Sequence, residues 1–327
     1  MKKKITALTL CAMLFALCFS AQAQQPGEIP RIGFLSTASP SILSARLEAF
    51  RQGLRELGYT EGKNIVVEYR WVEGKLDRLP DLTAELVRLK VAVIVTAGPT
   101  STRPAKEATR TIPIVMAQDG DPVGNGFIAS LARPSGNITG LSSLAPELTG
   151  KQLELLKETV PKLSRVAVLG TSSHPGNTQA FKETELAAGA FGLTLQPLDI
   201  LGPKDIEAAF RQARKKHAGA VLVLQSPVAN NQRIQIIDVV AKNRLPAMYD
   251  RVEFVEDGGL MTYSVSSTDL FRRAATYVDK ILKGAKPADL PVEQPKKFEF
   301  IINLRTAKQI GLTIPQWVLV KADRVIK

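Results

Sequence analysis

Short apolar runs rich in β-branched residues alternate with longer segments of helical period along most of the chain. The run at residues 32–35 has the character of a buried strand, and Leu47, Phe50 and Leu54 follow at the three- and four-residue steps of one helix face. The alternation restarts after Glu147 and continues as a second series. Such alternation is typical of βαβ units, and 327 residues exceed what one core usually organises. The pattern therefore predicts an α/β fold with two doubly wound parallel-sheet lobes.

The end of the chain does not begin a third series. A strand expected at 259–265 leads into a helix at 270–282, and another strand is expected at 298–304. We interpret this order as a chain that returns once to the first lobe before it ends in the second. We expect lobe 1 to comprise residues 29–142 and 264–292, lobe 2 to comprise residues 143–263 and 293–327, and a three-segment hinge to form near 142–145, 263–266 and 293–297.

The N-terminus has the features of a secretory signal peptide. Three lysines at 2–4 precede an apolar run at 5–19, and Ala21-Gln22-Ala23 supplies the small residues that a signal peptidase recognises. The apolar run is shorter than the roughly 20 residues that a membrane-spanning helix needs. We expect residues 1–23 to be removed and the mature protein to be periplasmic.

Both cysteines lie inside this leader, so the expected mature chain contains no thiol. Disulfides and thiolate metal sites are therefore not expected. An alternative interpretation makes Cys18 a lipid-modified residue. Leu17, immediately before it, is bulkier than the small residues that usually precede such a site, and this disfavours the lipid anchor.

The charge of the chain does not indicate nucleic-acid binding. The sequence has 43 Lys and Arg against 31 Asp and Glu, a net charge of +12 that falls to +9 without the three leader lysines. The basic residues are interleaved with acids, and no basic stripe with stacking aromatics or known nucleic-acid motif occurs. We expect a solvated basic surface, no nucleic-acid partner and a monomeric protein.

The common signatures of enzymes are missing from the sequence. It contains no Gly-x-Ser-x-Gly elbow, no Walker loop and no His-Glu-x-x-His. His174 and His217 are the only histidines and have no partners at metal-ligand spacing, although His174 lies in a Ser/Thr-rich loop where it can touch a ligand. We expect no enzyme activity, no catalytic residue, no cofactor and no metal. The alternative is a secreted hydrolase that uses Asp119, Asp121 or Asp250.

Polar residues follow several expected strands, where ligands of open α/β sheets bind. Ser36 and Thr37 follow the first strand of the first series, and Ser172 follows the first strand of the second. Thr100 and Ser101 stand where a buried strand opens onto a helix, so they either cap that helix or help its N–H groups hold a carboxylate. A helix is expected at 102–109 and a strand at 112–116. The Gly- and Asp-rich segment at 119–126 is expected to be a loop after that strand, in which Asp121 either shapes a turn or opposes a ligand ammonium.

Five blocks of sequence resemble the ABC-transporter substrate-binding family, whose members include binders of tryptophan and related amino acids. The blocks are TIPIV at 111–115, GDPVG at 120–124, SLARPSGNITG at 130–140, GGLMTY at 258–263 and ILKGAKPADLPVEQP at 281–295. The resemblance implies a type I periplasmic-binding-protein-like fold. It also implies a receptor that captures an amino acid or related small molecule in an interlobe cleft and delivers it to ABC transporter permease subunits in the inner membrane. The ligand-binding residues that the resemblance implies are Ser36, Thr37, Thr96, Gly98, Thr100, Ser101, Asp121, Ser172, Asn177, Gln225, Ser226, Asp250 and Tyr263.

One position departs from the family pattern. Family members often carry an acidic residue before the proline that follows the strand at 220–224, and this chain has Gln225-Ser226-Pro227. An amide does not neutralise a ligand ammonium as a carboxylate does. Either Asp250 or Asp121 replaces the acid, or the ligand lacks a charged amine. An alternative function with the same cleft is a periplasmic ligand-sensing accessory protein.

Overall fold

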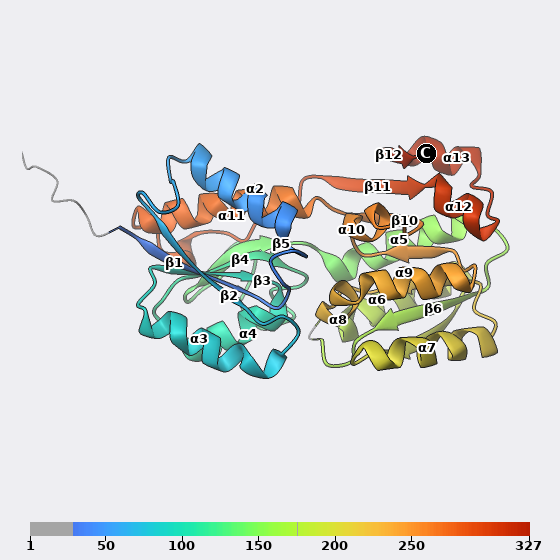
Figure 1. Ribbon diagram of the computed structural model, residues 1–327, viewed down its shortest axis with the longest axis horizontal. Coiled ribbons are helices and arrows are strands. Elements are labelled where there is room, and N and C mark those ends of the chain that lie inside the picture. Colours follow the sequence, from blue (N-terminus) through green and yellow to red (C-terminus); the bar gives the residue numbers. More distant parts are fainter. Residues whose placement is uncertain (1–28, 175) are drawn as a thin grey trace, which may run out of the picture.

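The structure is a computed structural model that describes residues 29–174 and 176–327, arranged as two α/β lobes side by side (Figure 1). The first lobe contains a five-stranded sheet in the order β2-β1-β3-β4-β5, and all its pairs are parallel. Its strands are β1 (Arg31–Ser36), β2 (Val66–Trp71), β3 (Val93–Ala97), β4 (Ile114–Asp119) and β5 (Ile138–Ser142).

The second lobe contains a seven-stranded sheet in the order β12-β11-β10-β9-β8-β6-β7. Its β10 and β11 are antiparallel, whereas every other pair is parallel. The sheet is therefore parallel, as the sequence pattern predicted, except for this one pair. The reason is that β10 leads the chain out towards the first lobe and β11 brings it back. The strands are β6 (Arg165–Gly170), β7 (Thr194–Asp199), β8 (Ala220–Val223), β9 (Ala247–Tyr249), β10 (Met261–Val265), β11 (Phe298–Asn303) and β12 (Arg324–Ile326).

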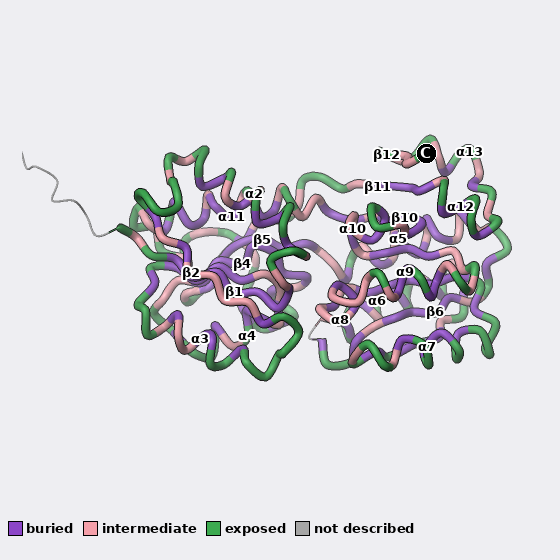
Figure 2. The backbone as a smooth tube through the Cα atoms, viewed as in Figure 1, coloured by how far each residue is buried: buried purple, intermediate pink, exposed green. Residues whose placement is uncertain are grey.

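Helices cover both faces of the first sheet. On one face α11, which comes late in the chain, packs against α2, and Phe34, Phe50 and Phe271 share the resulting core. On the other face Leu86 and Ile94 belong to a second core beneath α3 and α4. Figure 2 shows the buried strands enclosed by helices with exposed outer faces. The helices are α2 (Ser44–Glu56), α3 (Leu79–Arg88), α4 (Pro99–Ala108) and α11 (Ser267–Leu282), with a 3-10 turn η1 (Leu76–Arg78) before α3.

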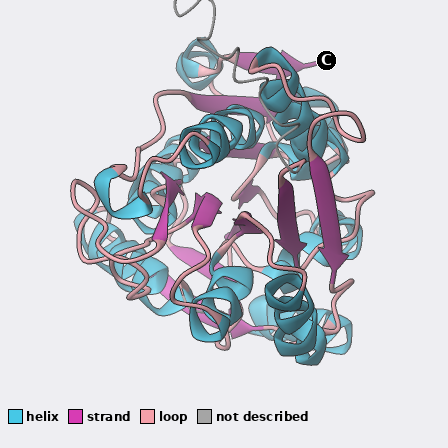
Figure 3. Cartoon of the chain, turned by 90° about the vertical axis from the view of Figure 1, so that its left-hand side faces the viewer, coloured by secondary structure: helices cyan, strands magenta, loops and turns pink. Residues whose placement is uncertain are grey.

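The second sheet is covered in the same way. Leu153 of α5 and Val318 of α13 belong to the core on one face, while Phe210 of α7 and Ile236 of α9 belong to the core on the other. Seen from the end of the first lobe, strands lie inside a surround of helices (Figure 3). The helices of this lobe are α5 (Ala145–Thr159), α6 (Asn177–Ala190), α7 (Pro203–Lys215), α8 (Pro227–Asn231), α9 (Arg233–Lys242), α10 (Val252–Glu256), α12 (Leu304–Ile310) and α13 (Gln316–Lys321).

The chain passes between the two sheets three times. It leaves the first lobe between β5 and α5, returns between β10 and α11, and leaves again after a 3-10 turn η2 (Pro287–Asp289) to enter β11. The crossing segments contact one another through backbone hydrogen bonds. Ser142 N donates to Glu293 O at 2.9 Å, and Ser266 N donates to Lys297 O at 3.4 Å. The three connections are therefore neighbours in space.

Two element boundaries near the cleft differ from the sequence-based expectation. Strand β4 continues to Asp119, which pairs with Ser142 of β5, although Asp119 was expected in a loop after a strand at 112–116. The continuation is buried, so the carboxyl belongs to the sheet and not to the loop. Helix α4 begins at Pro99 instead of Thr102, because proline fits the first helical position, where its missing N–H is not needed.

The described residues contain no helix that is long and apolar enough to cross a membrane. The expected signal peptide, with its cleavage after Ala23 and with Cys18, lies outside the described residues.

Candidate ligand-binding cleft

A cleft lies between the two lobes at the carboxyl ends of their parallel strands, and it has two adjoining chambers. Pro99, Gln118, His174 and Gln225 line both of them. The chambers have volumes of about 40 Å³ and about 50 Å³. A buried water needs roughly 10–15 Å³ by this measure, so each chamber has room for only a few water molecules. A ligand of amino-acid size therefore enters only if the lobes or their side chains move apart.

The first chamber, which we call the amide chamber, is lined by carboxamide side chains above an apolar wall. The amides are those of Gln118, Asn125, Gln152, Asn177 and Gln225, which come from both lobes. The described residues that line it include no Phe, Tyr or Trp. The other lining residues are Pro99, Gly120, Ser143, Ala145, Pro146, Leu148, Thr149, His174, Gly176, Ala180, Val223, Leu224, Asp250, Val265 and Ser267.

Hydrogen bonds hold three of these amides, Asn125, Gln152 and Asn177, in place. Asn177, at the start of α6, accepts from Thr171 N at 2.6 Å and donates to Gln225 O at 2.8 Å, so it ties two strand ends together. Gln152 of α5 donates to Tyr263 O at 2.8 Å. Because these side chains are fixed from behind, the chamber is preorganised to bind polar groups.

The second chamber, which we call the arginine chamber, is lined by hydroxyl groups and two buried guanidinium groups. The amino end of α4 also faces it through Gly98 and Thr100. Gly98 has φ of 102° and, within the described chain, no side-chain cap covers this helix end. Free N–H groups at a helix amino end attract anions. The remaining lining residues are Ser36, Thr37, Ala38, Leu43, Arg46, Ala97, Pro99, Gln118, His174, Gln225, Ser226, Pro227, Asn230, Arg251 and Phe271.

A buried cluster of charges adjoins both chambers. Arg46 of α2 lies with its Nε 3.0 Å from Glu253 Oε1 of α10, so this ion pair joins the two lobes. Arg251 Nε donates to Asp250 Oδ2 at 2.8 Å, and both side chains are only 8% exposed. Asp250 Oδ1 is buried and accepts no hydrogen bond from the described residues.

Burial shifts the pKa values within this cluster. Burial lowers the pKa of Arg46 to about 10, although Glu253 opposes the shift. Burial raises the pKa of Asp250, and Arg251 opposes that shift. For Glu253, burial favours the neutral acid, but Arg46 and Arg251 outweigh it and hold the pKa below its usual value. The charged forms of Arg46 and Glu253 therefore stabilise each other across the cleft.

His174 lies where the two chambers meet. Burial, followed by the charge of Arg251, lowers its pKa to about 4, so the imidazole is neutral at pH 7. Its Nδ1 lies 3.2 Å from Asn177 Nδ2, which can only donate, so Nδ1 accepts and Nε2 carries the proton. The ring therefore offers a neutral N–H donor.

Eight of the residues expected from the sequence line the cleft. They are Ser36, Thr37, Gly98, Thr100, Asn177, Gln225, Ser226 and Asp250.

The five other expected residues do not line either chamber. Thr96 is fully buried, with its Oγ1 2.8 Å from Thr102 Oγ1. Ser101 donates to Gly98 O at 3.0 Å, and Asp121 accepts from Gly124 N at 2.8 Å within its own turn.

The remaining two of these five residues have partners outside the cleft. Ser172 donates to Asp199 at 2.7 Å, and it lines a separate groove beside α6. The ring of Tyr263 stacks on Phe298 with centroids 6.0 Å apart. Both side chains are therefore engaged within the second lobe.

Several cleft residues were not expected from the sequence, and Arg46 is the most informative. It lies three residues after Leu43 and four before Phe50, which places a charge on the buried face of α2. Because a charge on an apolar helix face needs a partner, the position of Arg46 could have indicated a buried ion pair from the sequence alone. Gln118, Gln152 and Arg251 carried no comparable signal.

The acidic residues considered for hydrolysis do not meet in the cleft. Asp119 and Asp121 line neither chamber, and Asp250 is paired with Arg251. Within the described part of the chain, no group of three or more His, Cys, Asp or Glu residues is arranged to hold a metal ion.

Comparison with known proteins gives one family match and several relatives. The family model described as ABC transporter substrate binding protein matches residues 32–326. A tyrosine-binding protein from Clostridioides difficile (strain R20291) is 25% identical over 277 residues, which cover 84% of this chain and 78% of the relative.

Solved structures share the fold over 91% of this chain. A conserved domain protein from Vibrio cholerae has a TM-score of 0.87 at 26% identity, with all of that chain covered. A structure from Streptococcus pneumonia in complex with L-Trp has a TM-score of 0.86 at 26% identity, also with all of that chain covered. The ligand-free, open structure of a substrate-binding protein from Clostridium difficile has a TM-score of 0.68 at 21% identity, with 99% of that chain covered.

Proposed function

The chain belongs to the ABC transporter substrate-binding protein family, which is non-enzymatic, and from this premise we propose that it captures an amino acid or a related small molecule in the interlobe cleft. We propose that it delivers this ligand to ABC transporter permease subunits. The names of the tyrosine-binding and L-Trp-bound relatives make these two amino acids the first candidates.

The observation that carries the proposal is that the cleft has two ends of opposite character. The amino end of α4 and Thr100 offer donors to a carboxylate in the arginine chamber. Asp250 lines the amide chamber with a buried Oδ1 that has no partner among the described residues, and this oxygen can accept from an ammonium. Asp250 thereby takes the place of the acidic residue that family members often carry where this chain has Gln225.

We also propose the extent of the two lobes, the position of the hinge and the location of the protein. Lobe 1 comprises residues 29–142 and 264–292, and lobe 2 comprises 143–263 and 293–327. The three crossing segments act as the hinge, which supports closure because they lie together on the backbone hydrogen bonds of Ser142 and Ser266. The mature protein is a periplasmic monomer, which forms when the signal peptide is cleaved after Ala23.

A thermal-shift and calorimetric screen of the mature protein tests the proposal. The panel contains the twenty amino acids, purines, sugars and aromatic acids. A true ligand at a hundredfold excess over its Kd stabilises the protein by about 2.7 kcal/mol. The absence of any stabilising compound from refolded, ligand-free protein would contradict the proposal.

The Asp250→Asn variant tests the ammonium site. It removes the charge that would pair with the ligand amine, and we expect affinity for an amino-acid hit to fall roughly 10- to 100-fold by calorimetry. Asp121→Asn is the matched control, because Asp121 lies outside both chambers. Equal loss in both variants, or no loss in Asp250→Asn, would contradict the assignment of Asp250.

A further inference from the structure

Arg46 reaches from one lobe to the other across the cleft. It projects from α2 beneath Phe271, with its guanidinium carbon 5.9 Å from the ring centroid, and its side chain is 5% exposed. Its Nε lies 3.0 Å from Glu253 Oε1, which belongs to α10 of the other lobe. This contact exists only while the lobes are close together.

The ion pair leaves Arg46 incompletely satisfied. Its Nε and Nη2 are buried, and neither makes a hydrogen bond with the described residues. Glu253 and Asp250 attract the guanidinium, while Arg251 and Arg233 repel it. Arg251 is paired with Asp250, and Arg233 is paired with Asp257, so Glu253 is the principal partner of Arg46. A buried charge with unmade hydrogen bonds costs free energy.

The surroundings of Arg46 suit an anionic group. Arg46 lines the arginine chamber together with Thr100 and the uncapped amino end of α4, which both offer donors to an anion. Asn230, 6% exposed, lines the same chamber from the second lobe, and its Oδ1, which has no partner among the described residues, is an acceptor that suits a donor group of the ligand and not the anion. Both lobes thus contribute buried, unpartnered polar groups to one space.

We propose that Arg46 is a ligand-binding clasp that makes closure of the lobes depend on a carboxylate of the ligand. Glu253 holds the guanidinium across the cleft, and the ligand carboxylate accepts the hydrogen bond from Nη2 that no protein group accepts. The ligand class is therefore a carboxylate-bearing molecule, and its neutral amides bind poorly. This inference rests on the proposed function and adds a residue and a selection rule to it.

Closure depends on the ligand because burying the Arg46 and Glu253 charges costs free energy that their mutual attraction alone does not recover. A single ion pair buried at a closing interface often fails to offset the desolvation of its two charges. A ligand carboxylate supplies a second acceptor to Arg46, and this contact is worth more in the closed state, where Nη2 is buried and water no longer satisfies it. A ligand shifts an equilibrium by its differential affinity for the two states, so this contact favours closure.

Calorimetry with L-tyrosine, L-tryptophan and their C-terminal amides tests the carboxylate rule. We expect the wild-type protein to bind an acid roughly 10- to 100-fold more tightly than its amide. Arg46→Met is expected to lower that ratio at least tenfold. Arg55→Met is the matched control on the same helix, because Arg55 is exposed and pairs with Glu48, and it should keep the wild-type ratio. Retention of the wild-type ratio by Arg46→Met would overturn the proposal.

X-ray scattering without ligand tests the clasp independently. The double variant Arg46→Met/Glu253→Gln removes both charges while keeping similar side-chain volume, so closure no longer requires a charge to be buried. We expect this variant to have a smaller radius of gyration than the wild type without ligand. An equal or larger radius would overturn the clasp. If the wild type binds neither amino acid, the two candidate ligands of the proposed function are ruled out, and the scattering result decides whether Arg46 acts as the clasp.

Discussion

Asp119 shows how a single buried group near the cleft acquires unusual chemistry. It ends β4, it is fully buried, and burial raises its pKa to about 7. Asn125 Nδ2 and Asp121 N donate to its Oδ1 at 2.9 and 3.1 Å, which partly offsets that shift. Asn125 lines the amide chamber, so this carboxyl supports the wall of the cleft without lining it.

The raised pKa of Asp119 predicts a pH dependence of stability. Between its ordinary pKa of 3.8 and about 7, the folded state binds the proton more tightly than the unfolded state. This group therefore makes the protein less stable as pH rises through that window, and the loss is complete above about pH 7. In Asp119→Asn the dependence is removed, while an amide oxygen still accepts both hydrogen bonds.

Urea unfolding at pH 4, 5.5, 7 and 8 measures this effect. We expect the stability of Asp119→Asn relative to wild type to rise with pH up to about 7, by an amount on the order of a few kcal/mol. Asp238→Asn serves as the control with an unchanged profile, because Asp238 is exposed on α9 and is not among the groups that act on Asp119. A difference between Asp119→Asn and wild type that stays constant with pH would contradict the buried, protonated carboxyl.

At the scale of single residues, the sequence predicts where polar groups gather better than which way they point. Thr100, which the pattern of strand ends suggested, and Asn177, which the family resemblance implied, both line the cleft. Thr96 faces inward to Thr102, and Ser172 is engaged by Asp199, because each has a neighbour that satisfies it first. Such competition between partners depends on three-dimensional packing, which spacing along the chain does not reveal.

Among the elements, β5 depends on close approach to β4. Gly140 of β5 has φ of 135°, and a Cβ placed there would lie 2.2 Å from Met116 O. Both the conformation and the contact require glycine at this position. The pairing matters for function because β5 ends at Ser142, where the chain first crosses to the second lobe.

Gly140→Ala is therefore expected to destabilise the protein by roughly 3 kcal/mol or more. Gly189→Ala on α6 is the control, because a Cβ there meets nothing within 4 Å, and alanine favours a helix. Thermal unfolding of the two variants measures the difference. Similar melting temperatures for both would contradict the close packing of β5 on β4.

Element types were more predictable than element ends. The apolar strands and the amphipathic helices follow directly from their periodicity, as in α7 with Ile206, Phe210 and Ala213 buried. The short helices α8 and α10 were not expected, because five residues carry too little periodicity to be recognised.

At the scale of the whole molecule, the family and the fold class predicted from the sequence blocks are confirmed. The family model spans residues 32–326, and the L-Trp complex shares the fold with a TM-score of 0.86. The contacts between the lobes could not be predicted from the sequence, since the Arg46–Glu253 ion pair joins residues that no local pattern connects. The lobe boundaries and the periplasmic location remain predictions.

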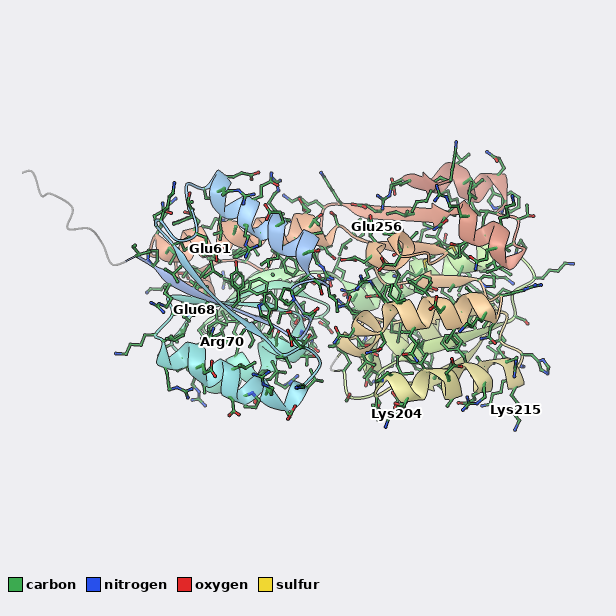
Figure 4. The ribbon with its side chains drawn as sticks, viewed as in Figure 1. Glu61, Glu68, Arg70, Lys204, Lys215 and Glu256 are labelled. Carbon is green, nitrogen blue, oxygen red and sulfur yellow. The ribbon has the colours of Figure 1, made fainter. Side chains whose placement is uncertain are left out.

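The central claim is that the lobes close on a small molecule. Because both native cysteines precede Ala23, spin labels can be attached to cysteines introduced at Asp81 on α3 and Lys204 on α7. These helices lie on the same side of the two lobes in Figure 1, and Figure 4 shows Lys204 projecting from the outer face of α7.

Pulsed electron–electron double resonance measures the distance between the two spin labels. This measurement, made with and without saturating L-tyrosine or L-tryptophan, tests the claim most directly. A shorter and narrower distance distribution with the bound amino acid is the predicted result, because closure selects one arrangement of the lobes. An unchanged distribution in the presence of a ligand that calorimetry shows to be bound would contradict capture by closure.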